Sequence, residues 1–317
     1  MLVIQSLRAL CLWEGWDTLE PLVVSAILED VAAGKEKGPQ SPYETSLTGE
    51  LTPSQHLELA RLASRPYDRV ARLPLPNKKM RRFSGRGEKG RRVPGGGGGE
   101  GGRKLTVAYW SYDYRDHPMG HLTRGLFCSH QIHDRVFTVL ASYGSDDRSS
   151  VRQSAKKCAG KFLDLSVMGD VESATAIAAE EPEIFVDLMA HTTGARHGIP
   201  ALKPAPIVAS YLGYPGTVGA DYTDYTIADK VVVPPELANV GFSEKLVYLP
   251  HTYQANDYNL THAFCGGETL KQCQASVRSS RGLDGFLDMW GGEGPVLCNY
   301  NNIHKMEPES FAVFVNI

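Results

Sequence analysis

The sequence contains no apolar run that approaches the roughly 20 residues a helix needs to cross a bilayer. The N-terminal stretch MLVIQSLRALCLWEGWD is apolar, but it carries Arg8, Glu14 and Asp17 and lacks a small-residue cleavage site. We therefore expect an amphipathic helix there and no signal peptide. The 317 residues have a net charge of -3, ordinary for one large or two modest domains without a membrane partner.

Cysteine is scarce and scattered, because the six cysteines form no C-x-x-C pair. This usage favours a reducing compartment, the cytoplasm or the nucleus, and disfavours a cysteine zinc site. Motif arrangements typical of nucleotide binding and of serine hydrolases are also absent. No G-x-G-x-x-G follows the first predicted strand, and neither G-x-x-x-x-G-K-[ST] nor G-x-S-x-G occurs. Dinucleotide, P-loop and simple serine-hydrolase functions are therefore disfavoured.

Two segments precede the regular part of the chain. Residues 1–76 predict a small helical region, in which LTPSQHLELARLASRP begins at a Thr52 or Ser54 cap and ends at Pro66. Residues 77–104 hold ten basic residues and ten glycines, which predicts a disordered linker. Such a segment can bind RNA by charge, but it contains no repeated RGG unit, so a solvated linker is favoured.

From residue 105 short apolar runs alternate with helix-like stretches. The predicted strands are 106–111, 135–144, 161–166, 184–190 and 207–212, followed by the shorter YTIADKVVV and EKLVYLP. This alternation predicts an α/β fold with a Rossmann-like, doubly wound parallel sheet over 105–258. We predict a linker at 259–291 and the start of a new α/β unit at 292–317.

Chemistry-bearing residues stand where the predicted strands end. Asp113 and His117 follow the first strand, and a histidine with a carboxylate suits proton transfer near neutral pH. His121 lies four residues after His117, but Pro118 stands where a zinc helix usually carries glutamate. A metal site is therefore disfavoured, while capping or surface roles for these histidines remain open.

Two further strand ends fall at the same edge of the predicted sheet. The fourth is followed by His191-Thr192-Thr193-Gly194, and the fifth by Leu212 and the turn Gly213-Tyr214-Pro215-Gly216-Thr217. The glycines there indicate either a tight turn or a ligand close to the backbone. Together the three ends predict a small-molecule cleft at the carboxyl edge of the sheet.

The same residues carry a family resemblance. VAYWSYDYRDHPMGHL, HTTGARHGIPALKPAPIVASYLGYPGTVGADYTDY and SEKLVYLPHTYQANDY resemble the catalytic region of protein O-GlcNAc transferases, glycosyltransferase family 41. LGYPGT is a highly specific part of this likeness, which covers about residues 105–258 and resumes at LCNYNNIHKMEP. It implies two Rossmann-like lobes of GT-B type, the first of which corresponds to the predicted sheet.

The resemblance also implies an activity. Members transfer N-acetylglucosamine from UDP-GlcNAc to Ser or Thr of intracellular proteins, with inversion and without a metal or other cofactor. It places Asp113 and His117 at the reacting centre, and His56, in the helical region, as a further active-site histidine. Which residue acts as the base stays open.

The remaining implied contacts concern the donor. The resemblance assigns Leu212, Gly213, Pro215 and Thr217 to substrate binding, with Gly213 and Pro215 leaving room for the sugar. It assigns Asn302 and Lys305 to substrate binding as well, with Lys305 on the diphosphate.

Two departures and two alternatives accompany the resemblance. Met119 stands where relatives have a small hydroxyl residue, and Asn302 where animal relatives have Gln. The likeness ends at about Pro308, so we expect most of the second lobe to be missing from these residues. The alternatives are a non-catalytic first-lobe binding module and O-fucosyl transfer from GDP-fucose.

Overall fold

The structure is a computed structural model, and it describes residues 6–8, 10–36, 41–46, 51–73, 104–133, 135–258 and 305–316. Asn302, the predicted linker 259–291 and all but Lys104 of the predicted linker 77–104 lie outside these residues. The predicted domain boundaries therefore stay predictions. Within the described residues no helix is both long and apolar enough to cross a membrane.

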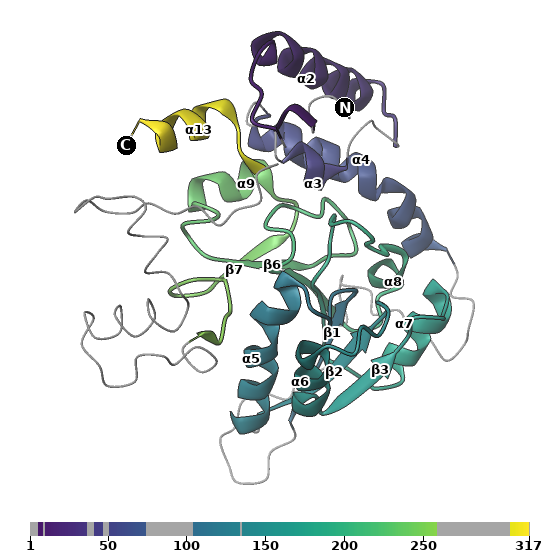
Figure 1. The fold of residues 1–317 in the computed structure, drawn as a ribbon. Coiled ribbons are helices and arrows are strands. Elements are labelled where there is room, and N and C mark those ends of the chain that lie inside the picture. The colour runs from purple at the N-terminus through teal and green to yellow at the C-terminus, as the bar shows by residue number, and fades with distance from the viewer. Residues whose placement is uncertain are drawn as a thin grey trace, which may run out of the picture.

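The described residues form a sheet flanked by helices, with the N-terminal helices lying across its upper end in Figure 1. The strands are β1 (Leu105–Ser111), β2 (Val136–Ser142), β3 (Lys161–Asp164), β4 (Ile184–Asp187), β5 (Ile207–Tyr211), β6 (Tyr225–Ala228) and β7 (Lys245–Tyr248). The helices are α2 (Trp16–Ala32), α3 (Pro42–Thr45), α4 (Pro53–Arg72), α5 (Pro118–His133), α6 (Ser150–Cys158), α7 (Asp170–Ala178), α8 (Gly198–Ala201), α9 (Ala238–Gly241) and α13 (Pro308–Val315), with a 3-10 turn η1 (Pro235–Leu237).

All strands of the sheet run parallel, in the order β3-β2-β1-β4-β5-β6-β7. Chain order reverses between β1 and β4, which pair with Trp110 opposite Asp187. The loops that leave these two strands diverge, and in doubly wound sheets this point opens the ligand crevice. The predicted doubly wound parallel sheet is confirmed, and the loop with Asp113 and His117 leaves β1 at this point.

The two faces of the sheet bury separate cores because successive residues of a strand point to opposite sides. Val107 and Tyr109 of β1 pack in the core that includes residues of α5 and α6. Ala108 and Trp110 pack in the core that includes residues of α7 and α8, where Trp110 stacks on Tyr143 with ring centroids 4.2 Å apart. Both faces of β1 are thus covered, so its position in the sheet is fixed.

Helix α4 begins where the sequence predicts but does not end there. Thr52 and Gln55 form a capping box, in which Gln55 N–H donates to Thr52 Oγ1 and Thr52 N–H donates to Gln55 Oε1. The predicted end at Pro66 is wrong, because the helix continues past this residue. Ser64, just before it, donates a 2.7 Å hydrogen bond to the Val218 carbonyl. Packing against the sheet domain therefore outweighs the hydrogen bond that proline removes.

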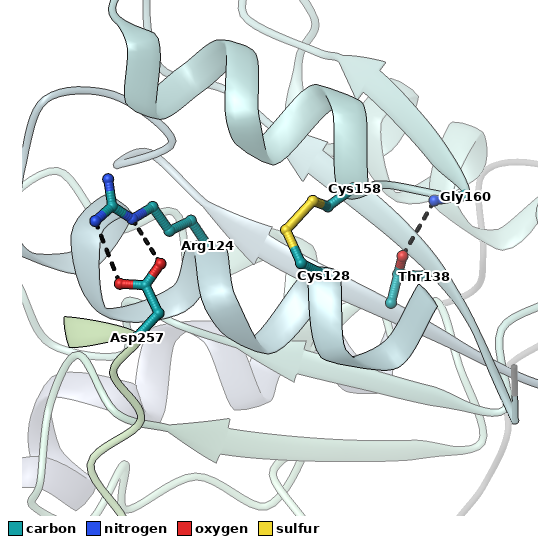
Figure 2. Close-up of a disulfide and its surroundings, with 6 residues drawn as sticks. All are labelled: Arg124, Cys128, Thr138, Cys158, Gly160 and Asp257. Atoms are coloured by element: carbon teal, nitrogen blue, oxygen red, sulfur yellow. Dashed lines mark hydrogen bonds and ion pairs between the residues drawn. A yellow bond between two sulfur atoms is a disulfide. The ribbon is translucent and has the colours of Figure 1, made fainter. Parts of the chain in front are cut away.

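A disulfide between Cys128 and Cys158 joins α5 to α6 (Figure 2). The sequence favours a reducing setting, in which disulfides are rare, yet the structure pairs these two cysteines, 30 residues apart. The pairing depends on α5 and α6 lying side by side on one face of the sheet, which cysteine spacing alone does not reveal. The other described cysteine, Cys11, is free.

Loss of the disulfide is expected to destabilise the fold. Cys128→Ser opens a loop with a sequence separation of 30 residues, and loop-closure entropy for that length gives about 3.5 kcal/mol. Urea unfolding of the oxidised variant and of the oxidised wild type measures the difference. Cys11→Ser is the matched control and should unfold like the wild type. Equal stability of the Cys128 and Cys11 variants would contradict a structural role for the bond.

Candidate functional site

Asp113 and His117 form a pair in the loop that joins β1 to α5. His117 Nδ1 lies 3.5 Å from Asp113 Oδ2, and the Asp113 side chain is almost fully buried. The other carboxylate oxygen of Asp113 accepts a 3.1 Å hydrogen bond from Arg115 Nε. The backbone N–H of Asp113 donates to Ser111 Oγ at the end of β1. The predicted placement of both residues at the carboxyl edge of the sheet is confirmed.

The surroundings of His117 favour its neutral form. Burial lowers the pKa of the ring, although the nearby Asp113 carboxylate works in the opposite direction. Nδ1 has two neighbours, because the Met119 N–H donates to it at 3.3 Å and Asp113 faces it. When Nδ1 is bare it accepts the Met119 N–H; when it is protonated it can donate to Asp113, which leaves Nε2 free to accept a proton.

The turn after β5 lies against the end of β4 and the start of α5. A Cβ on Gly213 would stand 2.0 Å from the Leu188 carbonyl oxygen and 3.6 Å from Met119 Cε. Gly213 therefore lets the ends of β4 and β5 pack closely, and the neighbouring Leu188 backbone alone explains the glycine. Leu212 just before it adopts φ 67°, a left-handed conformation that costs free energy in a non-glycine residue. Sequence reasoning missed the Met119 contact because it depends on how two distant loops pack.

The buried Glu244 carboxylate binds the end of this turn, at Thr217 and Val218. Glu244 accepts hydrogen bonds from Thr217 Oγ1 at 2.6 Å and from the Val218 N–H. His191 Nε2 lies 2.8 Å from the Val218 carbonyl oxygen, which the Ser64 hydroxyl also reaches. Sequence reasoning missed Glu244 because it lies 27 residues after Thr217, with no motif to connect them.

His56 lies at the start of α4 and faces the same turn. Its side chain lines a cavity of about 240 Å³ together with Pro215 and Thr217. Burial lowers the pKa of His56, so this ring is also neutral near pH 7. His56, Pro215 and Thr217 thus share one cavity, and the active-site role of His56 stays a prediction. Asp113 and His117 are not among the residues that line this cavity.

The loop after β4 lines a second, more polar cavity of about 470 Å³, against α3 and α4. His191 to Gly194 all contribute to its wall, as does His197. Burial lowers the pKa of His191 to about 4 and that of His197 to about 3. In the same region burial raises the pKa of Asp187, at the end of β4, to about 6.

These shifts predict that the fold weakens in acid. The histidines gain protons in the unfolded chain near pH 6.5 but resist them when folded, so stability falls as the pH drops from 6.5 towards 4. Asp187 opposes this, because it takes a proton more readily when folded. With two groups against one, these three residues should together lower the free energy of unfolding by about 1.4 kcal/mol per pH unit between pH 6 and 4.

Urea unfolding at a series of pH values measures this slope. His191→Gln keeps a donor for the Val218 carbonyl but does not titrate, so it should remove about one proton from the pH dependence. A pH dependence that is unchanged in His191→Gln would contradict the assignment.

Lys305 is exposed and immediately precedes the segment that leads to α13. The Phe311 ring of α13 packs against Trp13, with ring centroids 5.9 Å apart, so this segment lies beside the N-terminal region. The substrate-binding assignments of Lys305 and Asn302 stay predictions. Within the described residues no group of three or more His, Cys, Asp or Glu side chains is arranged to hold a metal ion.

The fold and the strand-end site define an α/β protein with a doubly wound parallel sheet and a histidine–carboxylate pair at its switch point. The family profile described as glycosyl transferase family 41 matches residues 98–279. The chain belongs to this family.

Several curated relatives are similar to the chain. An Arabidopsis thaliana protein named probable UDP-N-acetylglucosamine–peptide N-acetylglucosaminyltransferase SEC is 35% identical over 221 residues, which cover 69% of this chain and 21% of the relative. A Caenorhabditis elegans UDP-N-acetylglucosamine–peptide N-acetylglucosaminyltransferase is 37% identical over 158 residues, covering 50% of this chain and 14% of the relative. The chain thus spans about a fifth or less of the length of these relatives.

One solved structure is similar in fold. A mutant of the Thermobaculum terrenum O-GlcNAc transferase superposes with a TM-score of 0.55 at 20% sequence identity. The match covers 67% of this chain and 37% of that chain. It supports the α/β architecture described above.

Proposed function

We propose that this chain supplies the Asp113–His117 half of a site that transfers N-acetylglucosamine from UDP-GlcNAc to Ser or Thr hydroxyls of proteins. The observation that carries the proposal is the 3.5 Å His117–Asp113 pair at the switch point of the sheet, in a member of family 41. The names of the relatives favour N-acetylglucosamine over fucose as the transferred sugar. We place the reaction in the cytoplasm or nucleus and invoke no metal or other cofactor.

The proposed chemistry follows from the pair. The acceptor hydroxyl oxygen attacks the anomeric carbon, the bond from that carbon to the diphosphate oxygen breaks, and UDP leaves. With Nδ1 protonated and facing Asp113, Nε2 of His117 takes the hydroxyl proton, and the carboxylate stabilises the imidazolium that forms. Attack opposite the leaving diphosphate inverts the anomeric centre.

The donor is proposed to lie along the turn after β5. Leu212, Gly213 and Pro215 face the sugar, with Thr217 and His56 at the neighbouring cavity. A developing negative charge on the diphosphate needs a cation or aligned N–H groups, and we assign this role to Lys305, with Asn302 as a further contact.

A transfer assay with the purified chain tests the proposal. UDP-GlcNAc labelled in the sugar is incubated with a peptide rich in Ser and Thr, and with a matched peptide in which these residues are Ala. We expect label in the first peptide only, in an inverted linkage. Label from GDP-fucose but none from UDP-GlcNAc would overturn the donor assignment, and label from neither would overturn catalysis by this chain.

A further inference from the structure

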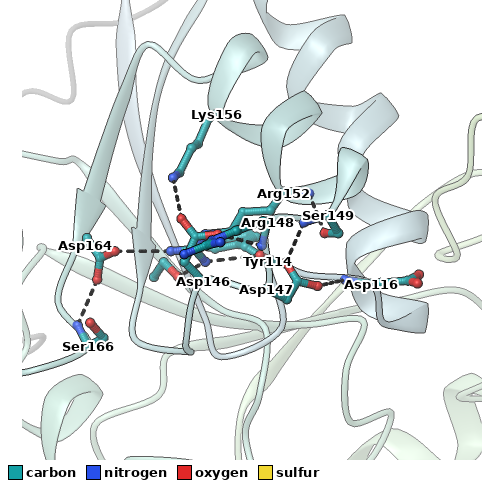
Figure 3. Close-up of polar contacts among 11 residues, drawn as sticks. Tyr114, Asp116, Asp146, Asp147, Arg148, Ser149, Arg152, Lys156, Asp164 and Ser166 are labelled. Carbon is teal, nitrogen blue, oxygen red and sulfur yellow. Dashed lines mark hydrogen bonds and ion pairs between the residues drawn. The ribbon is translucent and has the colours of Figure 1, made fainter.

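The start of α6 and the segment before it form hydrogen bonds with the loop that carries Asp113 and His117 (Figure 3). Two backbone groups of the loop are bound, the Tyr114 carbonyl and the Asp116 N–H. Arg152 Nη1 donates a 3.1 Å hydrogen bond to the Tyr114 carbonyl. The Asp116 N–H donates a 2.7 Å hydrogen bond to Asp147 Oδ2. These contacts lie on either side of Arg115, within the span between the paired residues.

Arg152 is fully buried, which is costly for a cation unless its donors are used. Beyond the Tyr114 carbonyl, its guanidinium donates to Ser142 Oγ at 3.0 Å and to Asp164 Oδ2 at 3.2 Å. Its Nε makes no hydrogen bond, but it lies 3.3 Å from Asp146 Oδ1 as an ion pair. The planar fork reaches β2, β3 and the loop together, which a lysine ammonium on a flexible stem would not reproduce.

Asp147 is exposed and accepts the hydrogen bond from the second backbone group of the loop, the Asp116 N–H. Its two carboxylate oxygens accept from the Asp116 N–H and from the Ser149 N–H, at 2.7 and 3.1 Å. The hydrogen bond from Asp116 is the main cause of a lowered pKa for this carboxyl. Asp147 is thus ionised at neutral pH and ties the catalytic loop to the N-terminus of α6.

Close backbone packing leaves the loop little room to adjust. A Cβ on Gly120, in the first turn of α5, would stand 2.3 Å from the Arg115 carbonyl oxygen and 2.8 Å from Val151 Cγ1 of α6. The loop is therefore enclosed between α5 and α6. Its backbone moves with any shift of the hydrogen bonds to Arg152 and Asp147.

We propose that Arg152 and Asp147 are positioning residues for the Asp113–His117 pair. They fix the loop backbone at Tyr114 and Asp116, and so set the distance between the carboxylate and the imidazole. The inference rests on the proposed function in that the pair performs sugar transfer. No sequence motif assigns this role to Arg152 or Asp147. Their hydrogen bonds reach the loop backbone at Tyr114 and Asp116 and neither of the paired side chains.

Two variants and one control test the proposal in the full chain. Arg152→Lys keeps the charge but loses the planar guanidinium. Asp147→Ala removes the acceptors of the Asp116 and Ser149 N–H groups, at an exposed position where the fold should tolerate the change. Lys157→Ala changes an exposed residue of the same helix that contacts no part of the loop. The first readout is the NMR titration of the His117 ring without substrate, assigned by comparison with His117→Ala.

The titration separates positioning from mere stability. The charged groups that act on the His117 ring are Asp113, Arg115 and His121. None of the three is replaced in the variants, and burial of the ring has a larger effect on its pKa than any of them. If the loop relaxes, the ring gains solvent and its pKa should rise towards the ordinary histidine value in Asp147→Ala and Arg152→Lys. The second readout is transfer, where kcat should fall roughly 10-fold or more, with KM for UDP-GlcNAc within about 2-fold.

The outcome of the His117 titration decides the proposal. An unchanged His117 titration in folded Asp147→Ala would overturn it, as would an equal shift in Lys157→Ala. If Arg152→Lys does not fold, Asp147→Ala alone carries the test. A wild-type chain that shows no transfer would count against the proposed function only, because the titration is measured without substrate.

Discussion

Replacement of His117 by alanine is expected to abolish most sugar transfer while the sheet stays folded. The ring is part-exposed and lies at the end of a loop, so its removal opens no core cavity. It removes the group that takes the proton of the acceptor hydroxyl, and general base catalysis of this kind contributes roughly 100- to 10,000-fold. Initial rates of transfer from UDP-GlcNAc at saturating acceptor measure the loss.

The matched control is a histidine at the far end of α5, the helix that begins directly after His117. His133→Ala removes an exposed histidine from the last turn of α5, so transfer and stability should both match the wild type. A His117→Ala variant that transfers at the wild-type rate would contradict the assignment of the pair.

Gly213→Ala is expected to destabilise the protein more than an alanine placed at a glycine whose Cβ would meet no close atom. The new Cβ would stand 2.0 Å from the Leu188 carbonyl oxygen, and backbone on both sides must shift to relieve the clash. We expect a loss of roughly 3 kcal/mol or more in the free energy of unfolding, measured by urea denaturation. Gly169→Ala is the control, because its Cβ would meet no atom closer than 3.8 Å.

This experiment also decides between the two explanations of the glycine-rich turn. The structure attributes Gly213 to the packing of the β4 and β5 ends, whereas the family resemblance attributes it to room for the sugar. A Gly213→Ala variant with wild-type stability but weaker UDP-GlcNAc binding would contradict the packing explanation.

The sequence alone is enough to predict the positions of the strands. It also predicts that the candidate site lies at the carboxyl edge of the sheet. The alternation of short apolar runs and helical stretches predicts a parallel sheet, and parallel strands bring their carboxyl ends to one edge. Asp113 and His117 could therefore be placed together from their positions after the first strand. Close contacts between distant segments could not be predicted. The Cys128–Cys158 bond requires α5 and α6 to lie side by side.

Local signals failed where packing outweighs them. Pro66 is a correct stop signal by backbone chemistry, yet α4 continues because its contacts with the sheet domain hold it. Glu244 and Arg152 carry no motif, since each acts through hydrogen bonds to backbone that folding brings near. Such buried charged residues are recognised only once their partners are known.

The most direct test of the account is calorimetric titration of the purified chain with UDP-GlcNAc. We expect saturable binding that Lys305→Ala weakens, because we propose that the lysine contacts the diphosphate. His117→Ala should reduce binding less than it reduces transfer. A heat signal no larger than that of dilution at millimolar UDP-GlcNAc would contradict the claim that these residues form a working donor site.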